Sequence, residues 1–360
     1  MTLPTRLVAS LGICAGLLLT GCSGDSPETQ PSAPDSSASA SVPADDPAAA
    51  TGGTCDATLG DASAPDPAAD PDEAASKEAL AAVSLSDDAA AAPTVSFDAP
   101  LQVSSEVIHV SDEGSGDQIA DGQLITFNFL VCDMVTGEKM HSTWGTTPDA
   151  DDPITQVLSV NNFGESLAAS LTSAKVGSRL LWGQPGVSAE ESYTGEAMNG
   201  YLYVLSVQDS QTLPDAASGT DVTPTDASLP AISITDGKPA VSVPDSFTDP
   251  AELVVQPLIE GDGAAVEAGQ TVVVKYTGWL TDGTQFDSSW DREAPEDVLM
   301  FDAGTGGVIQ GWDQGIVGQK VGSRVLLVVP SDLGYGEAGG GEKIPANATL
   351  VFVVDILAAF

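Results

Sequence analysis

The chain is 360 residues long, which exceeds the usual size of one compact domain, so two folded units with unfolded connections are expected. Its 52 acidic and 11 basic residues give a formal net charge of -41. A charge of that sign repels phosphate backbones, so we expect no nucleic-acid partner.

The N-terminus has the pattern of an export signal. Arg6 precedes an apolar run over residues 7–19, which is too short to span a bilayer but has the length of a signal-peptide core. The run ends in Leu19-Thr20-Gly21-Cys22, which resembles a bacterial lipobox. This resemblance implies removal of residues 1–21 and a lipid on the Cys22 thiol, with an ordinary signal peptide as the alternative. We therefore expect an extracytoplasmic protein that is lipid-anchored to the cell membrane.

Residues 22–92 are predicted to form a disordered tether, in which residues 74–83 could form a short helix. After Cys22 this segment consists mainly of Ala, Ser, Pro, Asp and Gly, has no aromatic residue, and contains Lys77 as its only basic residue. Such a composition cannot bury enough apolar surface to offset the entropy lost on ordering. The predicted function of the tether is to hold the folded domains away from the membrane.

The cysteines and histidines point to no metal site. Neither His109 nor His141 belongs to a Cys/His cluster with the spacing of zinc ligands. Export would leave Cys55 and Cys132 in a compartment where disulfides persist, and the sequence leaves open whether they pair.

From residue 93 onward the same order of features occurs twice, which predicts an internal duplication. The pentapeptide at residues 175–179 recurs at 320–324, and Trp144 recurs as Trp290. Glu-Gly-x-Gly followed by a β-rich run also occurs twice, at an offset similar to those of the other two landmarks. We therefore predict homologous domains at residues 93–209 and 232–360, joined by a flexible linker at 210–231 that is rich in Thr, Ser, Pro, Ala and Asp.

The second repeat is predicted to be α+β. Residues 271–280, 325–329 and 349–357 are rich in β-branched residues and predict strands, whereas residues 311–317 are the best candidate for a short helix. The expected fold of each repeat is a twisted antiparallel β-sheet wrapped around a short α-helix.

The motifs of the second repeat resemble those of FKBP-type peptidyl-prolyl cis/trans isomerases. They are Val274-Lys275-Tyr276-Thr277-Gly278-Trp279, Gly283 to Ser289, Val308 to Trp312, Pro330 to Gly336 and Ile344 to Leu350, in that order. The resemblance covers about the last hundred residues. It implies the same fold of a sheet around a helix, with a hydrophobic pocket for a proline ring.

The resemblance also assigns roles to individual residues. Trp312 would form the pocket floor, Tyr335 and the Ile309 amide would donate hydrogen bonds to substrate carbonyls, and Asp287 would orient Tyr276 and Arg292. The remaining expected site residues, which form the walls and the rim, are Phe286, Phe352, Val308, Ile344 and Leu299. Leu299 departs from the family, which commonly has phenylalanine there, and the glycine-rich segment 336–343 replaces a more structured flap.

Such a site requires no cofactor and no metal. A dry apolar pocket favours the twisted imide over the planar, more polar one, and thereby lowers the rotation barrier of about 18–20 kcal/mol. The expected function is isomerisation of X-Pro bonds in unfolded or exported polypeptides, with macrolides such as tacrolimus or rapamycin as further ligands of the pocket. The alternative is a non-catalytic proline-binding or chaperone module.

The first repeat is predicted to be a degenerate copy without activity. Met140 replaces Phe286, His141 replaces Asp287, and Leu167 replaces Trp312. Phe129 stands in place of Tyr276. These changes remove the expected pocket floor and its acidic edge.

Overall fold

The computed structural model describes residues 52–360 except 68–69, 87–90, 145–152, 193 and 236. The predicted signal core and Cys22 lie outside these residues. Contacts divide the chain into a first unit that ends at Ser210 and a second unit that comprises Gly122–Leu124 and Gln211–Phe360. In the described part of the chain, no helix is long and apolar enough to cross a membrane.

The second unit is built on a seven-stranded sheet with the order β10-β13-β17-β18-β14-β15, in which β16 also pairs with β14. All its pairings are antiparallel. Its strands are β10 (Gly219–Asp221), β13 (Val254–Gly261), β14 (Thr271–Leu280), β15 (Gln285–Ser288), β16 (Leu299–Asp302), β17 (Arg324–Val329) and β18 (Leu350–Ala359). The predicted strands at 271–280, 325–329 and 349–357 are confirmed to within two residues.

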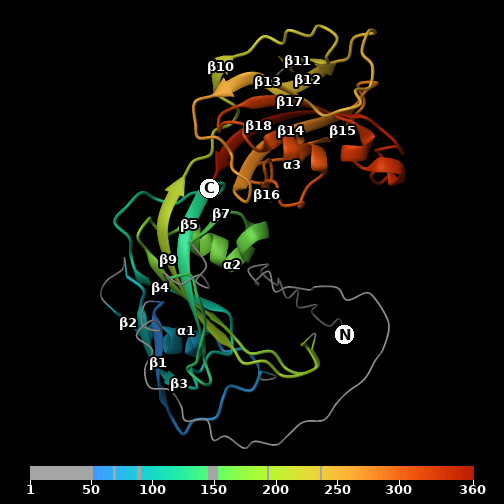
Figure 1. Cartoon of the computed structure of the whole chain (residues 1–360). Helices are drawn as coiled ribbons and strands as arrows, with labels where there is room; N and C mark the ends of the chain where they lie inside the picture. Colours follow the sequence, from blue (N-terminus) through green and yellow to red (C-terminus); the bar gives the residue numbers. More distant parts are fainter. Residues whose placement is uncertain (1–51, 68–69, 87–90, 145–152, 193, 236) are drawn as a thin grey trace, which may run out of the picture. The chain divides into compact units, whose positions relative to one another are not determined.

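One face of this sheet packs against the short helix α3 (Gln310–Ile316), where a helix was predicted one residue later in the chain (Figure 1). Trp312 and Ile316 of the helix are buried with the inward side chains of β14, β17 and β18. A Cβ atom at Gly311 would lie 2.4 Å from Val329, so glycine allows the helix to approach the sheet closely. Three 3-10 turns lie in the loops, η2 (Ser289–Asp291), η3 (Ser331–Leu333) and η4 (Gly336–Ala338).

The opposite face of the second sheet is also covered. Its buried side chains include Trp279, Leu326 and Val353, and they pack against a hairpin of β11 (Ala231–Thr235) and β12 (Lys238–Ser242). In the chain this hairpin lies between β10 and β13, two neighbouring strands of the sheet that it covers.

The sheet of the first unit has the order β4-β8-β9-β5-β6, with β7 pairing with β5. If the strands of each unit are matched by their order in the chain, β4, β8, β9, β5, β6 and β7 correspond to β13, β17, β18, β14, β15 and β16. The order of the strands within the sheet is then the same in both units, as an internal duplication predicts. The elements are β4 (Val107–Asp112), β5 (Leu124–Asp133), β6 (Lys139–Ser142), β7 (Ile154–Val157), α2 (Val160–Thr172), β8 (Arg179–Gln184) and β9 (Tyr201–Gln211). Helix α2 buries Phe163, Leu167 and Leu171 in the core of this unit.

Two pairs of equivalent hydrogen bonds explain why short motifs recur in the two units. The Ser178 hydroxyl accepts from the Gly114 amide at 2.9 Å, and Ser323 accepts from Gly261 at 3.0 Å. Thr143 likewise accepts from the Phe129 amide at 2.9 Å, as Ser289 does from Tyr276 at 3.0 Å. The recurring residues therefore hold loops to strands in the same way in both units.

The prediction of a disordered tether is wrong for the described residues between 52 and 92, whereas the possible short helix at 74–83 is present. The segment contributes β1 (Thr54–Leu59), α1 (Glu73–Ala81) and β2 (Ser84–Leu85), which join β3 (Thr94–Ala99) in a sheet of order β1-β3-β2. Leu80 and Val83 are buried in a hydrophobic cluster with residues of β3, β5, β8 and β9. A disulfide joins Cys55 on β1 to Cys132 on β5. A few apolar contacts and one covalent bond thus order a segment of weakly apolar composition.

The prediction of a flexible linker at 210–231 is also wrong for part of its length. The Ser218 amide donates to the Gly322 carbonyl at 2.9 Å, and the Ala217 amide donates to Asp355 Oδ2 at 2.8 Å. Strand β10 then adds to the edge of β13. Backbone hydrogen bonds, which leave no trace in composition, fix this segment to the second sheet.

Candidate functional site

A pocket of about 850 Å³ opens between α3, β14, β15 and the loops after β16 and β17. Of the eleven site residues predicted in the second repeat, ten line it, and the eleventh, Arg292, contacts two of them. The lining residues are Tyr276, Phe286, Asp287, Leu299, Gly307, Val308, Ile309, Trp312, Tyr335, Gly340, Gly341, Glu342, Lys343, Ile344 and Phe352. The fold therefore brings together residues that are up to 76 positions apart in the sequence.

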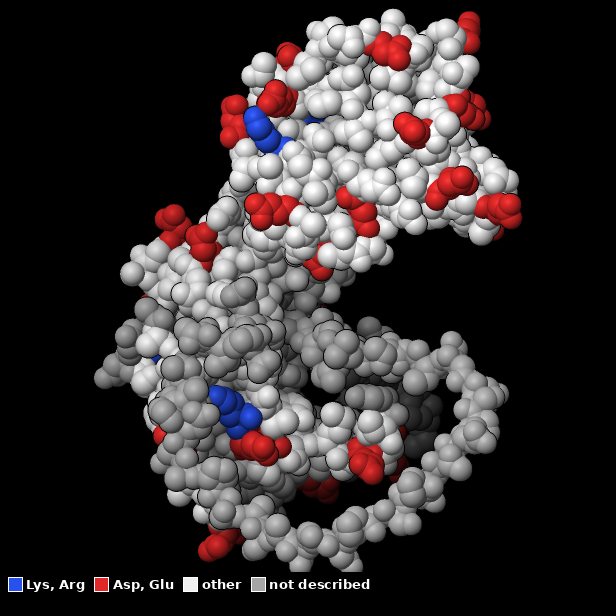
Figure 2. All heavy atoms as spheres, viewed as in Figure 1, with Lys and Arg blue, Asp and Glu red and all other residues white. Residues whose placement is uncertain are grey.

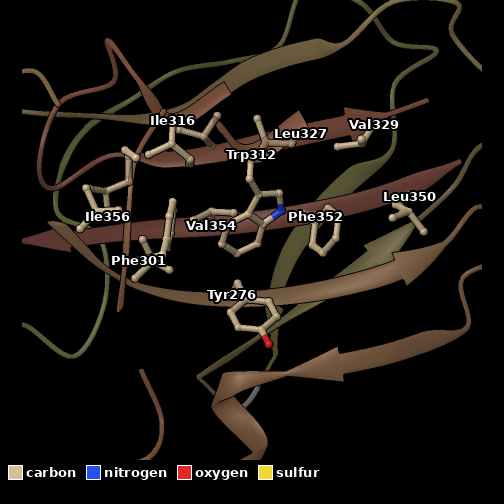
Figure 3. Close-up of a cluster of buried hydrophobic side chains, with 14 of the residues drawn as sticks. Tyr276, Phe301, Trp312, Ile316, Leu327, Val329, Leu350, Phe352, Val354 and Ile356 are labelled. Atoms are coloured by element: carbon tan, nitrogen blue, oxygen red, sulfur yellow. The ribbon is translucent and has the colours of Figure 1, made fainter. Parts of the chain in front are cut away.

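Trp312 is the centre of an aromatic cluster (Figure 3). Its ring meets Tyr276 edge to face at a centroid distance of 5.2 Å and Phe352 at 5.3 Å. Phe301 on β16 packs against it at 5.5 Å, and Phe352 meets Phe286 edge to face, also at 5.5 Å. Such tilted and edge-to-face pairs are the favoured geometry of aromatic rings, so the rings of the floor and wall hold one another in place.

Gly278 on β14 leaves space for two of these rings. A Cβ atom there would lie 2.4 Å from the Phe286 ring and 2.8 Å from the Phe352 ring. Any larger residue would push both rings out of position. The glycine in the Tyr-Thr-Gly-Trp motif is therefore required by the packing of the pocket wall.

A polar group of three side chains lies at one edge of the pocket. The Tyr276 hydroxyl donates a short hydrogen bond to Asp287 Oδ2. Arg292 Nη2 lies 2.9 Å from Asp287 Oδ1 and 3.1 Å from the Tyr276 oxygen. Its guanidinium carbon also lies 5.7 Å from the centroid of the Tyr276 ring. The predicted orientation of Tyr276 and Arg292 by Asp287 is therefore present.

These contacts shift the ionisation of the group away from neutral pH. Burial disfavours the charged form of Asp287, but the hydrogen bond from Tyr276 and the charge of Arg292 outweigh it, so the pKa of this carboxyl lies below its ordinary value. Burial, then the hydrogen bond to Asp287, raises the pKa of Tyr276. Stabilisation by the Asp287 contacts is thus present above its unfolded pKa of about 3.9 and is lost as pH falls through the lower folded value.

We expect the activity of this site to change little between about pH 6 and pH 8, because the proposed catalysis by an apolar pocket involves no proton transfer. Asp287 stays ionised and Tyr276 stays protonated over that range, and both histidines of the chain belong to the first unit. Steady-state rates on one peptide across this range test the expectation. A steep bell-shaped profile with the protein still folded would contradict catalysis without proton transfer.

Sequence reasoning missed two residues that shape the pocket. Phe301 packs behind Trp312, and its only sequence signal was its place in a short apolar run before the helix. Lys343 lies in the glycine-rich segment and donates from Nζ to the Phe286 carbonyl at 2.9 Å. A lysine between Glu342 and Ile344 gives no sequence signal of a role, because the contact depends on how the flap folds.

At the corresponding positions of the first unit the residues are arranged differently. Leu167 of α2 is fully buried, where the second unit has the Trp312 indole. Phe129 is buried and packs against His141 at a ring distance of 5.1 Å, whereas Met140 is half exposed. Neither the Trp-centred cluster nor the Tyr-Asp-Arg group has a counterpart at these four positions.

The fold and pocket together define a class of protein in which a twisted antiparallel sheet packs on a short helix beneath an aromatic ligand pocket. The family model described as FKBP-type peptidyl-prolyl cis-trans isomerase matches residues 263–357. An FK506-binding protein of Streptomyces anulatus is 47% identical over 34% of this chain and 96% of its own length. One from Neisseria meningitidis serogroup A is 45% identical over 30% of this chain and 96% of its own length.

A human relative named peptidyl-prolyl cis-trans isomerase FKBP2 is 52% identical over 25% of this chain and 61% of its own length. The bacterial relatives are matched over nearly their full length, and the family model matches within the second unit. The chain therefore belongs to the FKBP-type peptidyl-prolyl cis-trans isomerase family.

Proposed function

We propose that the second unit isomerises X-Pro bonds in unfolded or exported polypeptides at the cell envelope. The observation that carries this proposal is the aromatic pocket around Trp312, because a dry apolar site favours the twisted imide, in which the charge separation of the planar amide is lost. Each 1.4 kcal/mol of such differential binding gives about a tenfold rate increase. Isomerisation of a proline-containing peptide by the full chain tests the proposal directly.

A non-catalytic proline-binding or chaperone module is the second candidate. Leu299, which lines the pocket where the family commonly has an aromatic residue, and the glycine-rich flap favour it. The two candidates differ in one result: a binding module would bind the peptide without accelerating its isomerisation.

Within the isomerase proposal, Tyr335 positions the substrate by donating a hydrogen bond to a carbonyl. Its side chain is 42% exposed and lines the pocket, so the hydroxyl is accessible to a ligand. We expect Tyr335→Phe to lower kcat/KM by about tenfold or less, because one net hydrogen bond is worth about 0.5–1.5 kcal/mol. Rates at matched protein concentration check this. A loss of several hundredfold would instead indicate that the hydroxyl takes part in the chemical step.

The same pocket is proposed to bind macrolides such as tacrolimus or rapamycin. The two bacterial relatives are named FK506-binding proteins, and the residues of the pocket are aromatic and aliphatic apart from its rim. Inhibition of isomerisation by tacrolimus tests the assignment. The altered residue Leu299 and the glycine-rich flap bear on how tightly the drug binds.

The first unit is proposed to be an inactive FKBP-like copy. The shared strand order supports the common origin of the two units.

The chain is proposed to be a lipoprotein with its lipid on Cys22. The disulfide between Cys55 and Cys132 supports an oxidising, extracytoplasmic location. We expect Cys22→Ala to shift the protein from the membrane to the soluble fraction, because the acylated thiol is lost. Fractionation of cells that carry either form measures this. A variant that stays wholly with the membranes would refute the anchor.

A further inference from the structure

Lys343 differs from the other basic residues of the second unit in the group that it contacts. Lys238, Lys275, Arg292, Lys320 and Arg324 each form an ion pair with an Asp or Glu at 2.6–2.9 Å. The sixth basic residue, Lys343, has no ion pair with any acid in the described ranges and donates instead to a neutral backbone carbonyl. Acidic side chains are scattered over the visible face of the molecule, where few basic ones appear (Figure 2). Among the six basic residues of the second unit, Lys343 is therefore the exception.

The place of Lys343 is also specific. It lines the pocket, and its Nζ lies 2.9 Å from the carbonyl oxygen of Phe286, whose ring forms part of the wall. The contact leaves the full positive charge and two of the three N–H donors of the ammonium available. Of the other charged groups at the pocket, Asp287 is already paired with Arg292, and Glu342 is exposed beside Lys343 on the flap.

We propose that Lys343 makes the site selective for an acidic residue immediately before the proline. This inference rests on the proposed function, in which the proline ring fills the floor at Trp312. The residue before the proline then lies at the rim of the pocket. Lys343 of the glycine-rich segment is at this rim, and its ammonium contacts β15. An Asp or Glu side chain there pairs with the free donors, whereas a Lys or Arg side chain is repelled.

The expected effect is modest because the ammonium is exposed. An exposed ion pair corresponds to roughly a twofold to fivefold change in kcat/KM. The preference should weaken as salt rises from about 0.02 M to about 0.5 M, since screening shortens the range of the attraction. A preference that rested on the shape of the side chain would not depend on salt.

The test uses the full chain and four peptides that differ only in the residue before proline, which is Glu, Gln, Leu or Lys. We expect the wild type to prefer Glu over its uncharged isostere Gln, and to prefer Gln over Lys. Lys343→Met should remove the preference and Lys343→Glu should invert it, whereas Lys343→Arg should retain it. Lys320→Met is the matched control, because Lys320 is an exposed cation that does not line the pocket.

Equal rates on the Glu and Gln peptides in the wild type, or an unchanged preference in Lys343→Met, would overturn the inference. So would a preference that follows the residue after proline in a second peptide series. The Leu peptide separates the two hypotheses, because its isomerisation tests the proposed function alone. If no peptide is isomerised, titrations followed by the NMR signal of the Trp312 indole decide the inference: tighter binding of Glu than Gln that Lys343→Met abolishes supports it, and equal binding overturns it.

Discussion

Replacing Trp312 with alanine is expected to unfold or severely destabilise the second unit. The side chain is 4% exposed, and its ring packs against those of Tyr276, Phe301 and Phe352. Removing a buried indole leaves a large cavity and costs about 3–5 kcal/mol, which is a large part of the stability of a single domain. Denaturant unfolding followed by circular dichroism measures the loss.

A second substitution, Trp312→Leu, separates catalysis from folding. Leucine is the residue that the first unit has at the corresponding position, Leu167, where it is fully buried in the hydrophobic core. We expect this variant to fold, but to lose at least about tenfold in kcat/KM, because the rigid aromatic floor is gone. A folded variant of the full chain with nearly unchanged activity would show that the Trp312 floor is not needed or that the first unit is active.

The second large effect is expected at Asp355, whose carboxylate is fully buried. It accepts hydrogen bonds from Arg324 Nε at 2.6 Å, from Arg324 Nη2 at 2.7 Å and from the Ala217 amide at 2.8 Å. Asp355→Ala leaves the mostly buried Arg324 guanidinium without its partner, which typically costs about 3–5 kcal/mol. It also removes the contact that holds the segment before β10 to the sheet. Amide hydrogen exchange at Ala217 and Ser218 should therefore accelerate together with the loss of stability.

The exposed pair of Glu260 and Lys320 provides the control for this prediction. Its side chains are about half exposed and 2.7 Å apart, so Glu260→Ala should change the stability far less than Asp355→Ala does. Similar effects of Asp355→Ala and Glu260→Ala would contradict the argument from burial. Equally fast exchange of the Ala217 amide in Asp355→Ala and in Glu260→Ala, which keeps the hydrogen bond to Asp355, would show that this bond does not order the segment.

Most of the candidate site could be predicted from the sequence because its residues occur in short motifs with fixed local geometry. Tyr276 and Gly278 lie on one strand, and Trp312 follows Ile309 at the start of a short helix. Phe301 and Lys343 could not be predicted in the same way. Their contacts, with the Trp312 ring and the Phe286 carbonyl, form only after distant segments have folded together.

The two copies of the Lys-Val-Gly-Ser-Arg motif show the same limit. Ser178 and Ser323 make equivalent hydrogen bonds to loop amides, as the repeat suggests. The arginines that end the motif do not, because Arg179 pairs with Asp112 on β4 whereas Arg324 pairs with Asp355 on β18. An identical motif thus fixes the local turn, and the neighbouring strand selects the ion-pair partner.

The strands of the second sheet, its short helix and the residues that line the aromatic pocket could be predicted from the sequence alone. These features depend on β-branched runs and motifs that act over a few residues. Three features could be seen only in the folded chain. The segment from residue 54 to residue 99 forms a small sheet of the first unit, residues 219–221 join the second sheet, and Cys55 bonds to Cys132. The amino-acid composition of a segment does not reveal which individual contacts it makes. A disulfide, a few buried leucines and valines, and backbone hydrogen bonds to a distant strand supply the free energy that orders these segments.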